Sequence, residues 1–216
     1  MDLAVIEQYA RQILQNDATG HDIQHIERVL DNALRIAQRE KVVDPQELAL
    51  IQAAVWLHDV IDDKVVDDVA SATRQVQQVL QQAGATLAEQ QEILYIIEHQ
   101  SFSKNLAQRH PLSRAGQIVQ DADRLDATGA LAIARTFYYG GAKGHMLYNE
   151  LPVRDVETLS LEEYRENQSV IGHFYEKLFK IKDLMNTATG RRLAQERTQF
   201  MELFVTQFWD EIKGRK

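Results

Sequence analysis

The spacing of apolar residues is the feature that most restricts the fold of this chain. Along most of the 216 residues, apolar side chains recur at intervals of three and four, as an α-helix with one buried face requires. Residues 23–39 show the pattern clearly, and their expected buried stripe is Ile26, Val29, Leu30, Ala33, Ile36 and Ala37. No segment shows the strict alternation of a half-buried strand. The sequence therefore predicts an all-α fold.

Short polar phrases mark where several helices should begin. Asp44 precedes Pro45 and is followed by Glu47, which is the order of an N-cap, a first-turn proline and an acidic third position. Thr86 and Glu89 have the spacing of a capping box. We expect helices to begin at both caps, and further ones near Ser113 and Ser160.

One long stretch, residues 139–160, lacks a helical pattern and contains Gly140, Gly141, Gly144 and Pro152. We expect an apolar helix over 129–138 before it and two amphipathic segments after it, divided near 186–190. A long loop in a compact domain is commonly functional. The stretch is therefore a candidate lid over a site.

Composition narrows the function classes. The formal net charge is −8, so binding to a nucleic-acid polymer is disfavoured, and a phosphorylated substrate would need a metal or a few placed basic residues. The chain has no cysteine, which leaves His, Asp and Glu as metal ligands. The first residues do not have the pattern of a secretory signal, and no apolar run reaches the length of a membrane span. We expect a cytoplasmic protein without a membrane partner.

His58 and Asp59 end an apolar run, residues 53–57. A lone His-Asp pair is commonly just a solvated helix end, but His25 lies on the helix expected before it and Asp123 on one expected well downstream. Two imidazoles and two carboxylates suit Mn²⁺, Fe²⁺, Co²⁺, Ni²⁺ or Zn²⁺, with positions left for water and phosphate. His21 lies four residues before His25 on the same helical face and is an alternative ligand.

These residues resemble the HD superfamily of metal-dependent phosphohydrolases in their order, in Arg28-Val29 after the first His and in the phrase Ala122 to Leu125. Further phrases are similar to the YpgQ-type branch, and they span nearly the whole chain: residues 20–29, 57–64, 99–103, 121–129 and 173–178. The resemblance implies one helical HD domain over 1–216, with a metal-binding core at about 21–126 and a C-terminal helical extension at about 160–214.

The resemblance also implies roles. It assigns the metal ligands to His25, His58, Asp59 and Asp123, in preference to His21, Asp121 or Asp126. We expect a divalent metal, Mn²⁺ first, with Mg²⁺, Fe²⁺, Co²⁺, Ni²⁺ and Zn²⁺ as alternatives. Asp62 and Asp63 follow at a spacing similar to the HDxxED stretch of RelA/SpoT-type alarmone hydrolases, although the first acid here is Asp; we expect them to be catalytic. A solvated turn is the alternative. The expected substrate contacts are His21, Arg28, Lys64, His99, Arg124, Lys143 and Lys177.

The expected activity is hydrolysis of nucleoside triphosphates, deoxynucleotides included, to monophosphate and pyrophosphate, as in the YpgQ-type branch. A nucleotide monophosphatase or phosphodiesterase with the same metal core is the alternative enzyme. The alternative of another class is a non-catalytic sensor that binds metal or nucleotide. In each case the partner is a small phosphorylated compound, expected to be a nucleotide.

The C-terminal segment carries an apolar stripe at helical spacing. We expect it to pack in the core, with a homodimer surface as the alternative. Its members are Phe200, Leu203, Phe204, Phe208 and Ile212.

Overall fold

The computed structural model describes residues 1–15, 22–62, 65–101, 110–150, 154 and 169–216. Within these ranges the regular structure is helical, apart from one isolated bridge between Met146 and Ser169. The prediction of an all-α fold is therefore confirmed. The chain forms two compact units, Met1–Asp123 and Arg124–Lys216. One HD domain over the whole length, with the bounds given above for its core and extension, stays a prediction.

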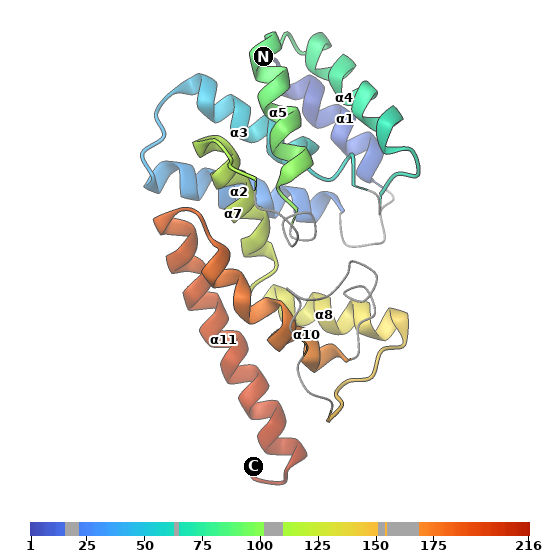
Figure 1. Ribbon diagram of the computed structural model, residues 1–216, viewed down its shortest axis with the longest axis vertical. Helices are drawn as coiled ribbons and strands as arrows, with labels where there is room; N and C mark the ends of the chain where they lie inside the picture. Colours follow the sequence, from blue (N-terminus) through green and yellow to red (C-terminus); the bar gives the residue numbers. More distant parts are fainter. Residues whose placement is uncertain (16–21, 63–64, 102–109, 151–153, 155–168) are drawn as a thin grey trace. The chain divides into compact units, whose positions relative to one another are not determined.

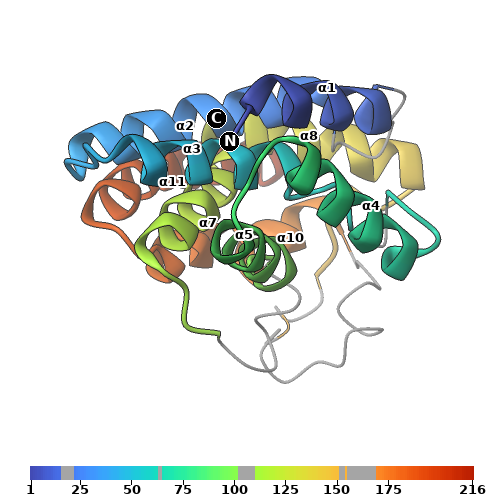
Figure 2. The same ribbon diagram turned by 90° about the horizontal axis from the view of Figure 1, so that it is seen from above.

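A nearly all-apolar helix, α3 (Pro45–Leu57), is central to the first unit. Its last seven residues apart from Gln52 are buried, and a helix that is apolar on every face needs neighbours on several sides. Those neighbours are α1 (Leu3–Leu14), α2 (Ile23–Arg39) and α5 (Leu87–His99), while α4 (Val69–Gln82) packs on α1 and α5, as Figures 1 and 2 show. The last helix to enter this unit is α7 (Arg114–Asp126).

The helices begin at the predicted caps. The Asp44 side chain accepts from Gln46 N at 3.0 Å, with Pro45 at the start of α3. Thr86 and Glu89 form both halves of the capping box of α5. Ser113 Oγ accepts from Gly116 N at 3.1 Å. The expected start at Ser160 lies outside the described residues. In the α2 stripe, Leu30 is only half-buried, whereas the other five residues are buried.

The second unit contains α8 (Gly129–Lys143), α10 (Val170–Glu176), the 3₁₀ helix η2 (Leu178–Leu184) and α11 (Ala188–Ile212). Here α11 packs on α8 and η2, and α10 packs on the same two elements. The expected division near 186–190 is confirmed, because α11 begins at Ala188 behind the cap Thr187. In the described residues, the amphipathic segment before that division is a short α-helix and a 3₁₀ helix instead of one long helix.

The expected end of helix at Tyr138 is wrong, because α8 continues through Gly140 and Gly141 to Lys143. A Cβ on Gly140 would lie 2.4 Å from Val170 Cγ2, so this glycine lets α8 and the start of α10 approach closely. The helix closes at Gly144, which has a left-handed φ of 69°. Two of the glycines therefore serve packing and capping, and the irregular stretch begins later than expected.

The predicted core packing of the C-terminal stripe is only partly confirmed. Phe204 packs against Phe137 and Phe174, with ring centroids 5.7 and 6.2 Å away. Phe200 and Leu203 are 52% and 69% exposed, and Ile212 is also exposed, so core packing is wrong for these three. The reason is that α11 buries the adjacent stripe, Ala194, Thr198, Met201 and Val205. The homodimer surface stays a prediction. None of the helices within the described ranges has the length and apolarity to cross a membrane.

Candidate metal centre

Three helices of the first unit deliver the predicted ligands. His25 lies in the first turn of α2, where the Asp22 side chain accepts a hydrogen bond from His25 N at 2.8 Å. His58 caps the C-terminus of α3, and Asp59 follows it directly. Asp123 lies on α7. A helix start, a helix end and a helix face therefore supply the four side chains.

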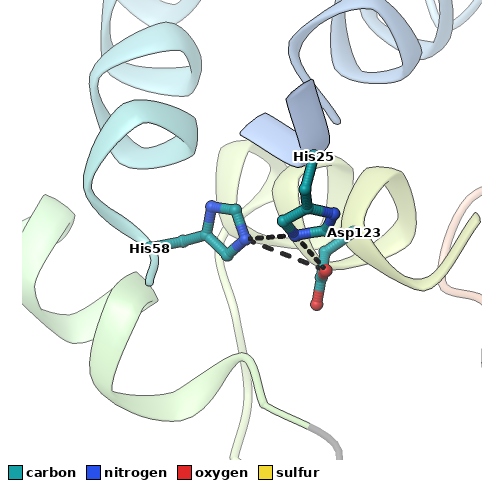
Figure 3. A group of neighbouring side chains, drawn as sticks. All are labelled: His25, His58 and Asp123. Carbon is teal, nitrogen blue, oxygen red and sulfur yellow. Dashed lines mark hydrogen bonds and ion pairs between the residues drawn. The ribbon is translucent and has the colours of Figure 1, made fainter. Parts of the chain in front are cut away.

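The functional atoms of these side chains point toward one another. His25 Nε2 lies 3.2 Å from His58 Nε2, and Asp59 Oδ2 lies 3.3 and 3.2 Å from these two nitrogens. Asp123 Oδ1 lies 3.5 Å from His25 Nε2 and 3.8 Å from His58 Nε2. Figure 3 shows the two rings and the Asp123 carboxylate converging on a common point. His25, His58 and Asp123 form a candidate metal site.

The main chain orients the His58 ring. His58 Nδ1 lies 2.7 Å from the Val55 carbonyl oxygen, a bond in which Nδ1–H donates. That assignment puts the lone pair of the ring on Nε2, which faces His25 and Asp59. A metal ligand needs this tautomer, so the last turn of α3 prepares His58 for coordination.

The charges in the cluster depend on one another. Burial opposes a charge on the His58 imidazole, but the carboxylates of Asp59 and Asp123 outweigh it and raise the pKa of His58 above its usual value. Burial also opposes the charge of Asp59, yet His58 and His25 hold the pKa of Asp59 well below its usual value. The pKa of Asp123 is lowered against burial chiefly by its hydrogen bond to His25. The two carboxylates thus stay ionised and attract positive charge.

One buried oxygen atom bears on whether a cation fits among these four side chains. Asp59 Oδ2 is buried and accepts no well-aligned hydrogen bond, although two imidazole nitrogens lie within 3.3 Å of it. A buried carboxylate oxygen is costly without a partner. A divalent cation among these nitrogen and oxygen donors would supply that partner, so the donor set fits a metal.

Two amides hold α7 in place, and no motif indicated them. Asn32 Nδ2 donates to the Ala122 carbonyl at 3.4 Å, beside Asp123. Gln120 Nε2 donates to the Gln100 carbonyl at 2.9 Å, which links α7 to the end of α5. The one available signal was Asn32 itself, since a polar residue three positions after Val29 interrupts the buried stripe of α2.

The remaining predicted residues of the first unit lie on or near these elements. Asp62 is half-buried in the turn that leaves α3, and its N–H donates to the Asp59 carbonyl at 3.0 Å. Arg28 is half-buried one turn after His25. The His99 ring stacks on Tyr95, with centroids 4.2 Å apart, and also contacts His110 at 4.3 Å, a residue that the sequence did not mark. The predicted residues His21, Asp63 and Lys64 lie outside the described residues.

Three predicted substrate contacts belong to the second unit. Arg124 is buried, and its Nη1 donates to the Leu184 carbonyl, which gives the guanidinium a packing role. Lys143 ends α8 with its ammonium 5.8 Å from the centre of the Tyr139 ring, and Lys177 is the C-cap of α10. Their contact with substrate stays a prediction.

Asp121 and Asp126 are the two acids that were weighed against Asp123 as metal ligands. Asp121 is fully buried. The Asp126 carboxylate pairs with the Arg135 guanidinium at 2.7 Å.

The comparison with protein families decides the family question. The HD domain profile matches residues 22–128, which include all four converging side chains. YpgQ of Bacillus subtilis strain 168 is 38% identical over 210 residues, which cover 97% of this chain and 93% of YpgQ. The chain belongs to the HD-domain family. The predicted resemblance is thereby confirmed, including its YpgQ-type branch.

Solved structures of similar proteins agree with this assignment. A protein from Lactobacillus plantarum matches with a TM-score of 0.83 and 42% identity, over 98% of this chain and 97% of the other. Bacillus subtilis YpgQ in complex with ADP matches with a TM-score of 0.76 and 35% identity, over 97% and 94%. An HD-superfamily hydrolase from Bacillus thuringiensis matches with a TM-score of 0.75 and 36% identity, over 98% and 96%. This HD protein is a hydrolase with a His/Asp metal site.

Proposed function

We propose that this HD hydrolase cleaves nucleoside triphosphates, deoxynucleotides included, to monophosphate and pyrophosphate, with a divalent cation held by His25, His58, Asp59 and Asp123. The observation that carries the proposal is the buried Asp59 Oδ2, which lies 3.2 and 3.3 Å from two imidazole nitrogens and lacks a hydrogen bond. Support for a nucleotide comes from YpgQ, which was crystallised with ADP.

The donor set favours a transition metal. Two imidazoles beside two carboxylates suit Mn²⁺, our first choice, as well as Fe²⁺, Co²⁺, Ni²⁺ and Zn²⁺, whereas Mg²⁺ prefers oxygen ligands alone. A bound divalent cation would lower the pKa of water and neutralise charge on phosphate oxygens. Two hydrogen bonds would position the ligands for such a cation. The Val55 carbonyl fixes the tautomer of His58, and the Asp22 carboxylate fixes the backbone of His25.

We assign the proton acceptor to Asp62 or Asp63. Asp62 lies three residues beyond Asp59 and is tied to it through the main chain, so its position depends directly on the ligand turn. In the proposed reaction, the oxygen of water forms a bond to a phosphorus atom and the bond between the α- and β-phosphates breaks. Pyrophosphate leaves, and the proton of the water passes to the carboxylate.

Basic and imidazole groups would then hold the phosphates. We propose His21, Arg28, Lys64 and His99 for this role in the first unit, and Arg124, Lys143 and Lys177 in the second. Among these, Arg124 already donates to a main-chain carbonyl, so its contribution would be made through its remaining N–H groups.

A product assay tests the proposal. The purified protein is first analysed for bound metal and then incubated with Mn²⁺ and a panel of ribo- and deoxynucleoside triphosphates, while pyrophosphate and orthophosphate are measured separately. We expect one pyrophosphate for each monophosphate formed and no turnover by Asp59→Ala. Stoichiometric orthophosphate without pyrophosphate would refute the proposal in favour of a phosphatase. Metal binding by the wild type without any turnover would favour the alternative of a non-catalytic sensor.

A further inference from the structure

Arg11 connects the two helices that carry the metal-binding histidines. It lies in the last turn of α1, a helix that packs against α3 and α4. Arg11 Nη2 donates to Glu27 Oε1 on α2 at 2.8 Å, and the guanidinium carbon lies 5.0 Å from the centre of the Trp56 ring on α3. Figure 2 shows these three helices. One side chain therefore contacts α2 and α3 at the same time.

The two contacts of Arg11 lie behind the metal ligands. Glu27 is two residues after His25, and Trp56 is two residues before His58. Side chains two residues apart on a helix do not face the same way, and the burial agrees, because His25 is 3% exposed whereas Glu27 is exposed. Arg11 therefore acts on both ligand turns from outside and does not enter the metal site.

Three interactions hold the Arg11 guanidinium. Besides the bond to Glu27, Arg11 Nε donates to Glu7 Oε1 at 2.9 Å, one turn earlier on α1. Trp56 is only 4% exposed, so the cation lies over a ring that is otherwise enclosed, and a cation–π contact is stronger where water is excluded. The positive charge also lies at the end of α1 where the helix dipole is negative. The guanidinium is thus fixed relative to all three helices.

The separation of the two histidines is what this contact can control. His25 Nε2 and His58 Nε2 lie 3.2 Å apart, and they belong to different helices. Imidazole nitrogens bind a transition metal at about 2.1 Å, and functional sites tolerate errors of only about 0.5 Å in the position of their groups. A small shift of α2 relative to α3 would therefore take one nitrogen out of reach of the metal.

We propose that Arg11 is a positioning residue for the metal centre, which holds α2 and α3 at the separation that lets His25 and His58 bind one divalent cation. This effect is opposite in sign to that of its charge, because a guanidinium near a cation site repels the cation. The inference rests on the metal-binding part of the proposed function and on no particular substrate or reaction.

Titration of Arg11→Gln with Mn²⁺ tests the inference. The ion is added to the metal-stripped full-length protein, and free Mn²⁺ is measured by electron paramagnetic resonance. We expect Arg11→Gln to bind Mn²⁺ about fivefold more weakly, the loss of one exposed ion pair and one cation–π contact. Its charge alone predicts the reverse. The difference from the wild type should shrink in about 1 M salt, where charges are screened beyond about 3 Å.

Matched variants separate the link between the helices from other effects. Glu7→Gln removes the bond within α1 and keeps the link to α2. Arg192→Gln removes the same charge from an exposed pair within α11, with Glu196 at 2.7 Å. Each should change the Mn²⁺ affinity less than about twofold. Added to Glu27→Gln, the Arg11→Gln change should likewise have less than about a twofold further effect, because the link to α2 is already lost.

The visible spectrum of bound Co²⁺ provides a readout of ligand geometry that a loss of overall stability does not alter. We expect the spectrum to change in Arg11→Gln and Glu27→Gln and to stay as in the wild type in Glu7→Gln and Arg192→Gln. Circular dichroism of the metal-free proteins shows that each variant is folded. If Arg11→Gln does not fold, Glu27→Gln takes its place, judged by the Co²⁺ spectrum, since Glu27 is exposed.

Three results would overturn the inference. They are Mn²⁺ binding by Arg11→Gln as tight as that of the wild type with an unchanged Co²⁺ spectrum, an equal loss of affinity in Glu7→Gln, and a wild type that binds no Mn²⁺. Failure of the triphosphate assay alone would leave the inference unaffected, since these readouts require metal binding and no turnover.

Discussion

His58 in the first unit and His173 in the second are both shielded imidazoles, yet their pKa values shift in opposite directions. Burial disfavours the charged form of both rings. Around His58 the carboxylates of Asp59 and Asp123 overcome burial and raise the pKa. Around His173, the neighbours Lys177, Arg154 and His145 act in the same direction as burial and lower the pKa. The neighbours, and not the residue type or its depth, decide the charge of each ring.

The difference bears on what the first unit can bind. A cluster that keeps carboxylates ionised in a buried place attracts cations. The carboxylates of Asp59 and Asp123 therefore support the proposed metal, whereas the imidazole of His173 stays neutral near pH 7.

Removing a ligand should have the largest effect. We expect His58→Ala to lose its metal and to lower kcat/KM by about a thousandfold or more, because a metal contributes several kcal/mol to the transition state. Metal content after dialysis and steady-state kinetics with Mn²⁺ measure the two losses. A variant that keeps both its metal content and its turnover would contradict the assignment of His58 as a ligand.

Asp63→Asn should separate catalysis from metal binding. The variant keeps the four ligands, so we expect normal metal content with turnover reduced about a hundredfold or more, the usual effect of removing a general base. Asp62→Asn is the parallel variant at the other acid, and Asp67→Asn is the matched control, at an exposed acid shortly after the pair. Metal loss equal to that of His58→Ala would make Asp63 a ligand instead of a catalytic group.

A smaller effect should appear in the pH dependence of stability. The pKa of His173 falls from 6.5 to about 3 on folding, so between these values the unfolded chain binds a proton that the folded chain does not. Stability should therefore decline as the pH is lowered from about 6.5 toward 3, and His173→Gln should flatten this decline. Denaturant unfolding of both proteins over this range isolates the effect as their difference. Parallel curves would mean that His173 gains its proton as easily when folded.

Local signals in the sequence predicted much of the first unit. The caps at Asp44 and Thr86 and the stripe of α2 depend on neighbours within a few residues, and they appear where expected. The convergence of His25, His58, Asp59 and Asp123 is long-range, and its prediction came from the resemblance to the HD superfamily. Asn32 belongs to no motif, and its role in holding α7 follows only from its hydrogen bond to the Ala122 carbonyl.

The second unit was harder to predict because its determinants lie far apart in the chain. Gly140 suggests a loop until Val170 is seen packed against it. The exposed position of Leu203 follows from which side of α11 faces α8 and η2, and helical spacing alone does not choose between adjacent stripes. The pairing of Arg154 with Glu176 spans 22 residues, and only Glu176 lies in a phrase of the resemblance.

The bond between His58 Nδ1 and the Val55 carbonyl has a consequence for how this protein tolerates mutation. In many metalloproteins a carboxylate side chain orients the ligating imidazole, and replacing that residue removes the orientation. Here the acceptor belongs to the main chain, so every amino acid that keeps α3 helical at position 55 retains it. The side chain there is free to change with the packing of the core, and the orientation of this histidine is robust to genetic drift at that site.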